Sequence, residues 1–504
     1  MPNVVRFALP SARDLYVPGV GIFVDGYLDV PTDWLSSVER ARYRTPPYGA
    51  IEIGIVDAAT PKAPLPAAPV PPPADPYPQY LDTSEVWDSQ TGRLREDRIP
   101  ERLSQASLGA AFETPRANTV VVWGDSYAAR TDATSGIDTY RSAQAPWSWA
   151  AVLTRHRMRL VKNAGVHGQG TADILARFDT DVAAHNPGWV VIMAGTNDVA
   201  GGVSAAAVRD NLTAMLDAVA SIGAYAVVAT IPPRNTLTAA QRLVQVQVNQ
   251  WLRDQAATRK RMALVDFWTP LLDPATFGVN ASVAPDGIHP NGVGAARLGR
   301  ALAAVFNQLA PERPLLGHST ENPLLLTANP YLTGTGGTLG TGVTGSVAAG
   351  WTVQSETGSA ITATASKVAR TDGIPGDWQQ ISLTAGTGVV LLQNEDGVNT
   401  DWIPGTTQVY AECEFQTDAD LAAVTKFHLG VYTLNAAFQG QGQVEDLQWI
   451  SGDTWAPEAR LASGVFRTPV LTIPATADKR VVPNFTFRGT GTFRVGRMAL
   501  YKVS

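Results

Sequence analysis

The chain has 504 residues, more than one hydrophobic core usually supports, so about three domains are expected. Charged residues make up 17% of it, the net charge is −6 and no basic cluster is present, which argues against a nucleic-acid partner. The single cysteine, Cys413, excludes an internal disulfide, and no apolar stretch has the length of a membrane span.

The first 58 residues contain short β-like runs at 4–9, 19–30 and 50–56, separated by proline and glycine turns, which predict a small β-rich module. Between Pro61 and Pro78, nine of eighteen residues are proline, so residues 59–114 are expected to begin as an extended spacer. The first residues lack the basic start and apolar centre of a signal peptide, and none is expected.

Two segments follow the proline run: Asp75-Pro76-Tyr77-Pro78-Gln79-Tyr80-Leu81 and Arg98-Ile99-Pro100-Glu101-Arg102-Leu103-Ser104. They resemble segments of bacteriophage minor tail and tail-fibre proteins, except that Tyr77 stands where histidine is common, which weakens the case for a histidine-bound metal at a trimer axis. The resemblance implies a virion protein that acts at the host cell surface, attaches through residues 1–58 to other tail proteins and favours a homotrimer. A generic proline-rich linker is the alternative interpretation.

The central region alternates apolar runs, at 119–123, 159–162, 189–194, 225–231 and 262–267, with helical patterns such as the one that starts at Ser204. This alternation predicts a parallel sheet with helices on both faces. Polar tetrapeptides follow two of the runs directly: Gly124-Asp125-Ser126-Tyr127 and Gly195-Thr196-Asn197-Asp198. Both are expected at the carboxyl edge of the sheet, where ligands bind.

The residue types at this edge suggest nucleophilic catalysis. A serine hydroxyl needs an adjacent base to attack a carbonyl, and His289, within Asp286-Gly287-Ile288-His289-Pro290, is the candidate base for Ser126. Asp286 is placed to accept the second ring N–H of His289 and so fix its tautomer. We therefore predict Ser126, Asp286 and His289 as catalytic residues.

Together with Asn163-Ala164-Gly165-Val166-His167-Gly168, these motifs resemble the SGNH (GDSL-type) esterase family over about residues 115–312. The four landmarks of that family fall on Ser126, Gly168, Asn197 and His289. The resemblance implies an oxyanion hole made by the backbone N–H groups of Ser126 and Gly168 and the side-chain amide of Asn197. It also implies a three-layer flavodoxin-like α/β fold and a serine esterase that needs no cofactor and no metal.

Each residue has a structural alternative. Ser126 is also a good cap for the helix after its strand, Asn197 and Asp198 are common in turns, and Asp286 is suited to cap the helix that starts near Pro290. Asp198 is expected to be structural, and His167 to lie either at the pocket or on the surface. The other histidines, at positions 156, 185, 318 and 428, show no nearby second metal ligand in the sequence.

Residues 320–504 are rich in Gly, Thr, Val and Trp and in β-like runs, and predict an antiparallel, jelly-roll-like β-sandwich. The last run, 493–501, is similar to the final strand of carbohydrate-binding modules. Five tryptophans are candidates for stacking on sugar rings, although at least half are expected in the core: Trp351, Trp378, Trp402, Trp449 and Trp455. Cys413 is expected to be a buried core residue.

These observations predict a multidomain chain: 1–58, a β-rich attachment module; 59–114, a spacer and connector; 115–312, the hydrolase domain; and 320–504, the β-sandwich. The favoured function is a tail-associated esterase that removes acyl groups, foremost acetyl, from glycans or lipids of the host envelope. Two alternatives remain: a catalytically silent receptor-binding or structural tail protein, and a free extracellular bacterial carbohydrate esterase.

Overall fold

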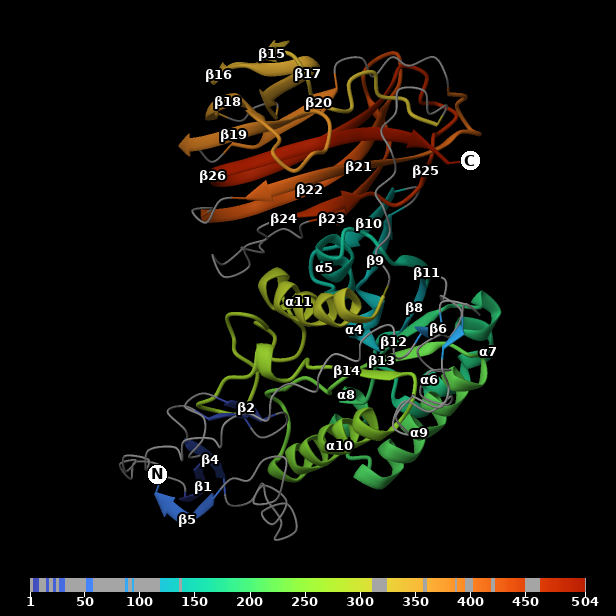
Figure 1. Cartoon of the computed structure of the whole chain (residues 1–504), viewed down its shortest axis with the longest axis vertical. Coiled ribbons are helices and arrows are strands. Elements are labelled where there is room, and N and C mark those ends of the chain that lie inside the picture. Colours follow the sequence, from blue (N-terminus) through green and yellow to red (C-terminus); the bar gives the residue numbers. More distant parts are fainter. Residues whose placement is uncertain are drawn as a thin grey trace. The chain divides into compact units, whose positions relative to one another are not determined.

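The computed structural model describes seven strands before residue 117 and then residues 118–135, 138–310, 324–356, 360–385, 388–394, 402–417, 422–448 and 463–503. The chain divides into two compact units, Met1–Ala117 and Asn118–Ser504 (Figure 1). The catalytic motifs all lie in the second unit.

The first unit contains a three-stranded antiparallel sheet in the order β4-β1-β5 and two short hairpins. Its strands are β1 (Asn3–Ala8), β2 (Leu15–Val17), β3 (Gly21–Phe23), β4 (Tyr27–Pro31), β5 (Ile51–Asp57), β6 (Trp87–Asp88) and β7 (Arg93–Leu94). The proline-rich run and the two fibre-like segments, 75–81 and 98–104, lie outside the described residues.

A five-stranded parallel sheet forms the centre of the second unit, in the order β11-β8-β12-β13-β14. The strands are β8 (Thr119–Gly124), β11 (Arg159–Gly165), β12 (Trp189–Met193), β13 (Tyr225–Ala229) and β14 (Met262–Val265). Numbered along the chain, the order is 2-1-3-4-5, a doubly wound arrangement in which ligands bind outside the carboxyl ends of the strands. The predicted central α/β sheet is confirmed.

Helices cover both faces of this sheet because its apolar side chains alternate between them. One face carries Val120 and Val122 and packs against α5 and α11, and the other carries Val121 and Trp123 and packs against α9. The helices are α4 (Ser126–Ala129), α5 (Pro146–Leu153), α6 (Thr171–Ala176), α7 (Phe178–Asp181), η3 (Ala183–His185), α8 (Thr196–Ala200), α9 (Ala205–Ser221), α10 (Ala239–Thr258), η4 (Thr269–Leu271) and α11 (Gly292–Leu309).

The remaining strands form a β-rich region in which most pairings are antiparallel. They are β15 (Gly336–Leu339), β16 (Val343–Gly345), β17 (Val347–Ser355), β18 (Thr362–Ala369), β19 (Asp377–Ala385), β20 (Val390–Asn394), β21 (Gln408–Thr417), β22 (Ala422–Leu434), β23 (Gly440–Gln448), β24 (Ser463–Arg467), β25 (Leu471–Thr472) and β26 (Arg480–Lys502). The first half of β26 pairs with β20 and β22, and its second half with β19 and β21. Phenylalanines contributed by both halves and by β21, β22 and β24 pack into one buried cluster.

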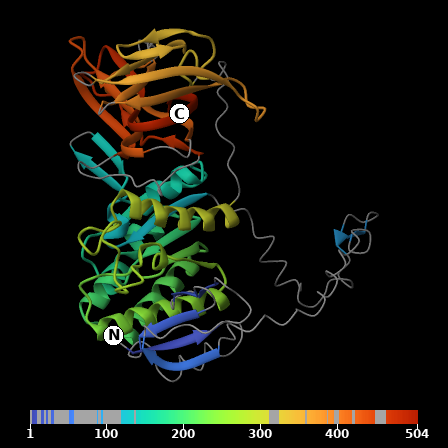
Figure 2. The same cartoon turned by 90° about the vertical axis from the view of Figure 1, so that its left-hand side faces the viewer.

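A hairpin from residues 118–310, the part of the second unit that carries the catalytic motifs and is called the catalytic half below, extends this C-terminal region. β9 (Asp132–Ser135) and β10 (Asp138–Ser142) follow the nucleophile helix α4 directly, and β10 pairs in parallel with β23. Figures 1 and 2 both show this pair of strands beside β23. The sequence range predicted for the hydrolase domain, 115–312, thus contributes two strands, β9 and β10, to one edge of the C-terminal sheet.

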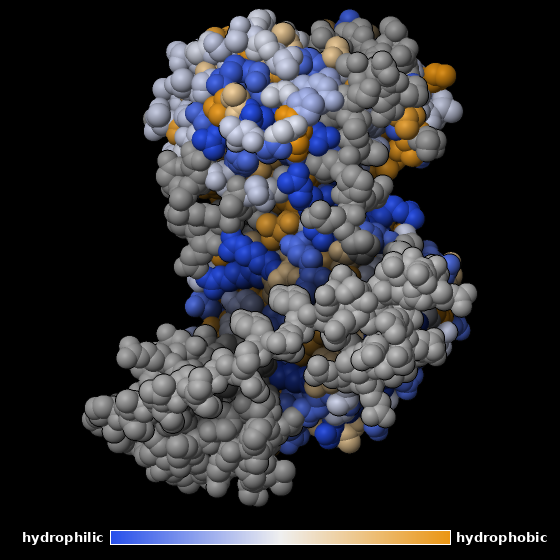
Figure 3. All heavy atoms as spheres, viewed as in Figure 1, coloured by the Kyte–Doolittle hydropathy of each residue, from blue (hydrophilic) through white to orange (hydrophobic). Residues whose placement is uncertain are grey.

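The described surface is largely hydrophilic in the view of Figure 3, with apolar residues scattered over it. Among the described residues no helix combines the length and apolarity needed to cross a bilayer. Cys413 is fully buried, as predicted. Trp351 and Trp378 are buried and Trp402 is half-buried, while Trp449 and Trp455 lie outside the described residues.

Candidate active site

Ser126 occupies a sharp turn between β8 and α4. Asp125 caps the helix by accepting a hydrogen bond from the Tyr127 backbone N–H at 3.0 Å. Gly124 and Gly165 make this turn possible, because a Cβ atom at either position would come within 2.0 Å of backbone atoms of Met193 or Ala129. Glycine therefore allows the strand ends and α4 to pack closely around the serine.

Ser126, His289 and Asp286 form one continuous hydrogen-bonded chain. The Ser126 Oγ lies 2.9 Å from His289 Nε2, and His289 Nδ1 lies 2.8 Å from Asp286 Oδ2. Because the carboxylate accepts the Nδ1–H, Nε2 is left to accept the serine hydroxyl. The structure thus brings together the three residues predicted as catalytic, although Ser126 and His289 are 163 positions apart in the sequence.

A tight turn holds His289 in place. The Asp286 Oδ1 accepts the backbone N–H groups of Ile288 at 2.9 Å and His289 at 2.7 Å, and the hydroxyl of Tyr127 donates to the Ile288 carbonyl. The cap of α11 is Asn291, which accepts the Gly294 N–H at 3.0 Å. Asp286 therefore orients the histidine and its turn, while Asn291 fills the helix-capping role.

The environment lowers the pKa of both titrating partners. Partial burial lowers the pKa of His289, and electrostatic repulsion from Arg130 and His167 adds to this, although the bond to Asp286 acts in the opposite direction. Burial alone would raise the pKa of Asp286, but the hydrogen bonds from the His289 side chain and from two backbone N–H groups outweigh it. Both shifts favour a neutral imidazole beside an ionised carboxylate.

Two of the three expected oxyanion donors come from the β11–α6 loop and from α8. Gly168 is exposed in the β11–α6 loop with φ +79°, a value that favours glycine, and Asn197 is half-buried on α8. One amide hydrogen of Asn197 is donated to the Gln169 carbonyl at 3.0 Å, which leaves the second for another acceptor. This bond joins the asparagine to the loop of Gly168. His167, in the same loop, is exposed and close enough to His289 to affect its pKa.

Asp198 anchors the end of the β11–α6 loop through hydrogen bonds from Thr171. Its buried carboxylate accepts the Thr171 N–H at 2.8 Å and the Thr171 hydroxyl at 2.7 Å. The structural role expected for Asp198 is therefore a specific one, since it anchors the segment that follows Gly168. Its position directly after Asn197 at the end of a buried strand was the only signal for it in the sequence.

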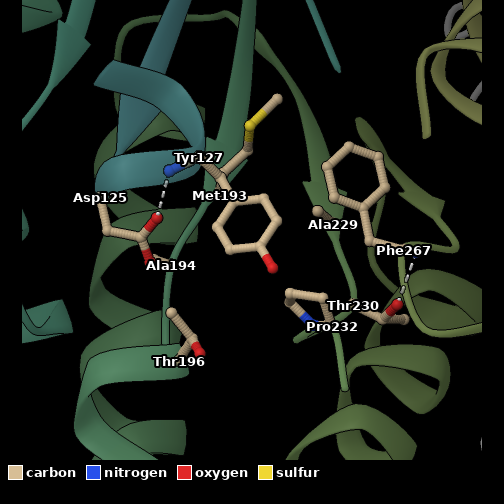
Figure 4. A pocket seen from close by; sticks show the side chains of 9 residues that line it. All are labelled: Asp125, Tyr127, Met193, Ala194, Thr196, Ala229, Thr230, Pro232 and Phe267. Atoms are coloured by element: carbon tan, nitrogen blue, oxygen red, sulfur yellow. Dashed lines mark hydrogen bonds between the residues drawn. The ribbon is translucent and has the colours of Figure 1, made fainter. Parts of the chain in front are cut away.

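A small cavity lies beside the nucleophile turn, lined by both neighbours of Ser126 (Figure 4). Its volume of about 10 Å³ is room for about one water molecule, so it is too small for an acyl group. Complete burial raises the pKa of Asp125 to about 7, although the bond from the Tyr127 N–H and the charge of Arg234 lower it. Sequence reasoning missed Asp125, Tyr127 and Arg234, because nothing marks a buried carboxylate or a supporting tyrosine beforehand.

Across the part of the chain that the structure describes, no group of three or more histidine, cysteine or acidic side chains is disposed to hold a metal ion. His156 and His428 each approach one carboxylate, at Asp446 and Glu445, within the C-terminal region.

Residues 122–297 match the GDSL-like lipase/acylhydrolase family. No curated protein matches the chain. Similar solved structures include a G-D-S-L family lipolytic protein from Desulfitobacterium hafniense (25% identity, 37% of this chain and 99% of that one, TM-score 0.31) and an acetylxylan esterase from Geobacillus stearothermophilus (20%, 40% and 99%, 0.32). A third is a GDSL-like lipase from Bacteroides thetaiotaomicron (20%, 41% and 97%, 0.31).

At these TM-scores the structural similarity by itself establishes no function. The family match stands on its own, and it spans Ser126, Gly168, Asn197 and His289. The chain therefore carries a GDSL-like lipase/acylhydrolase domain at residues 122–297 and is a serine ester hydrolase.

Proposed function

We propose that Ser126 is the nucleophile of this hydrolase, and that its substrates are short acyl esters, foremost acetyl esters of glycan hydroxyl groups. The observation that carries the proposal is the hydrogen-bonded chain from Ser126 through His289 to Asp286. The serine oxygen attacks the ester carbonyl while its proton passes to His289 Nε2. His289 then protonates the departing alcohol. In the second step His289 takes a proton from water, which attacks the acyl-serine, and it returns the proton to Ser126 Oγ as the acid leaves.

The negative charge on the carbonyl oxygen needs donors that are already in place. We assign this role to the backbone N–H groups of Ser126 and Gly168 and the free amide hydrogen of Asn197. The bond from Asn197 to Gln169 and the anchoring of Thr171 by Asp198 keep these donors positioned. Preorganised donors of this kind are typically worth about a hundred- to a thousand-fold in rate each.

The preference for a short acyl group on a glycan rests on the side chains around Ser126. Asp286 and His167, beside His289, are exposed and polar, which suits a small acyl group on a hydroxyl-rich alcohol better than a long lipid chain.

The test is hydrolysis of p-nitrophenyl esters of increasing chain length, followed by release of acetate from acetylated polysaccharide. We expect acetate esters to be cleaved fastest and Ser126→Ala to abolish turnover. Ser221→Ala, an exposed helical serine, is the matched control and should behave as wild type. Full activity of Ser126→Ala would refute the nucleophile assignment, and a preference for octanoate would refute the short acyl group.

We also propose that the chain works on a bacteriophage tail at the host surface, alone or as a homotrimer. The support is the resemblance of residues 75–81 and 98–104 to segments of tail-fibre proteins. Electron microscopy of particles with antibody against this chain tests it: label on the tail supports the proposal. Protein found only free in the medium favours the extracellular carbohydrate esterase instead.

A further inference from the structure

A polar pocket lies on the C-terminal sheet, on the face opposite its aromatic core. It has a volume of about 310 Å³, near the lower end of small-ligand sites. Its lining comes from adjacent strands: Leu391 on β20, His428 and Tyr432 on β22, Gln443 and Glu445 on β23, and Asn484 and Thr486 on β26. Glu356, Lys426 and Gln448 complete it.

The strand register explains why these side chains converge. His428 is paired with Thr486, and Gly430 is paired with both Asn484 and Glu445. The side chains between them, such as Phe427, Leu429 and Phe485, point into the core and are fully buried. Gly430 thus lies between the polar residues, and a Cβ atom there would come within 2.7 Å of the Tyr432 ring.

The polar groups of this pocket are buried, yet some have no partner. His428 is 4% exposed and Asn484 is 9% exposed. Within the described part of the chain, neither His428 Nδ1 nor Asn484 Oδ1 has a hydrogen-bond partner. A buried polar atom without a hydrogen-bond partner is unfavourable, so a pocket lined by two such side chains is suited to a ligand with hydrogen-bonding groups.

Other side chains in the pocket are held firmly. The Tyr432 hydroxyl donates to Glu445 Oε1 at 2.5 Å, and His428 Nε2 lies 3.7 Å from the same oxygen. The Gln443 side chain donates to the hydroxyl of Tyr140 at 3.0 Å. Since Tyr140 belongs to β10, the hairpin of the catalytic half supports one wall of the pocket.

The lining indicates the chemistry of the ligand. Among the described residues, the lining carries both hydrogen-bond donors and acceptors, Leu391 is its one aliphatic side chain, and two carboxylates face a single lysine. An anion would meet net negative charge, and an acyl chain would meet polar atoms. A neutral ring that carries several hydroxyl groups fits both the volume and the mixed hydrogen-bonding capacity.

We infer that this pocket binds one neutral sugar residue of a glycan, as a site separate from Ser126. His428 and Asn484, which line the pocket and each keep one unpaired polar atom, are the side chains that contact its hydroxyls. The inference does not depend on the esterase reaction, because no residue of the pocket belongs to the catalytic chain. In the same molecule it would hold a glycan while the other site acts on esters.

The test is saturation-transfer NMR and titration calorimetry of the full chain with methyl glycosides of glucose, galactose, mannose, xylose and N-acetylglucosamine. We expect at least one glycoside to bind, and Asn484→Ala and Glu445→Gln each to weaken it about tenfold, the equivalent of about 1.4 kcal/mol. Gln441→Ala is the matched control, since Gln441 shares β23 but, among the described residues, its side chain donates to the carbonyls of Gln439 and Gly440 and to no pocket residue.

Hydrolysis of p-nitrophenyl acetate serves as the fold control and should be unchanged in all three variants. Binding by none of the glycosides would overturn the inference, as would binding that Asn484→Ala and Glu445→Gln leave intact. Loss of binding together with loss of hydrolysis in Asn484→Ala would show misfolding, and Glu445→Gln, which keeps the side-chain volume, then decides. If Ser126→Ala retained activity, the nucleophile assignment would be wrong, but the glycan-binding result would be unaffected.

Discussion

Replacing Asp446 by alanine should destabilise both halves of the second unit together. The carboxylate is fully buried on β23 and accepts hydrogen bonds from Arg141 at 3.3 Å, His156 at 3.0 Å and the Arg467 backbone N–H at 2.8 Å. Arg141 lies on β10 and His156 follows α5, so both come from the catalytic half. One side chain therefore connects two parts of the chain that lie 290 to 305 positions apart in the sequence.

The size of the effect follows from what remains after truncation. The Arg141 side chain is 14% exposed and would keep its charge but lose this carboxylate, with the Arg467 carbonyl and the more distant charge of Asp132 as its remaining partners. Removing one member of a buried ion pair costs about 3–5 kcal/mol, and we expect a loss in that range for Asp446→Ala. Asp446→Asn keeps the shape and one acceptor, so it should cost about 1–3 kcal/mol.

Urea unfolding followed by tryptophan fluorescence, with esterase activity measured in parallel, checks this prediction. Asp372→Ala is the matched control, because the Asp372 side chain is 42% exposed and its partner Arg370 also pairs with Glu414. That variant should lose about 0–1 kcal/mol. The reasoning fails if Asp446→Ala loses no more than Asp372→Ala, or if activity and fluorescence are lost in two separate transitions.

Four further outcomes are expected. Since His289 must be neutral to accept the Ser126 proton and its pKa is lowered from 6.5, kcat/KM should rise with pH and reach half its maximum below 6.5; a midpoint above 7 would contradict this. Asn197→Ala should reduce kcat about a hundred- to a thousand-fold, and a change in KM alone would remove Asn197 from the oxyanion hole. Asp198→Asn should lower kcat by loosening the loop after Gly168 while Ser126 stays reactive toward a fluorophosphonate; loss of that labelling would point to a wider disruption. Burial lowers the folded-state pKa of His156 to about 4, so folding stability should fall by up to about 3 kcal/mol as pH drops from 6.5 to 4, and His156→Gln should flatten that slope in urea titrations.

The sequence was sufficient for the parts of this molecule that depend on local patterns. The five apolar runs became the five parallel strands, and the helix predicted from Ser204 begins at Ala205 with Ser204 as its cap. The Ser126, His289 and Asp286 side chains meet because strand ends and helix starts gather at one edge of such a sheet.

Other parts could not be predicted because they depend on pairing across hundreds of residues. The β9–β10 hairpin is short and polar, and its partner β23 lies about 300 positions further along the chain. Asp446 and His156 meet across 290 positions, with no local signal at either residue. The polar residues of the pocket, such as Asn484 and Glu445, follow the alternation of a solvated strand face, so the sequence alone cannot distinguish a binding surface from an ordinary one.

The position of β9 and β10 has a consequence for how this chain can be divided or recombined. A fragment that starts near Asn322 would lack two strands of its sheet, and one that ends near Glu312 would carry an unpaired hairpin directly after the nucleophile helix. Exposed strand edges of this kind promote aggregation. The esterase and the β-rich region should therefore be inherited, expressed and grafted onto other proteins as one module, since no single cut in the chain separates them.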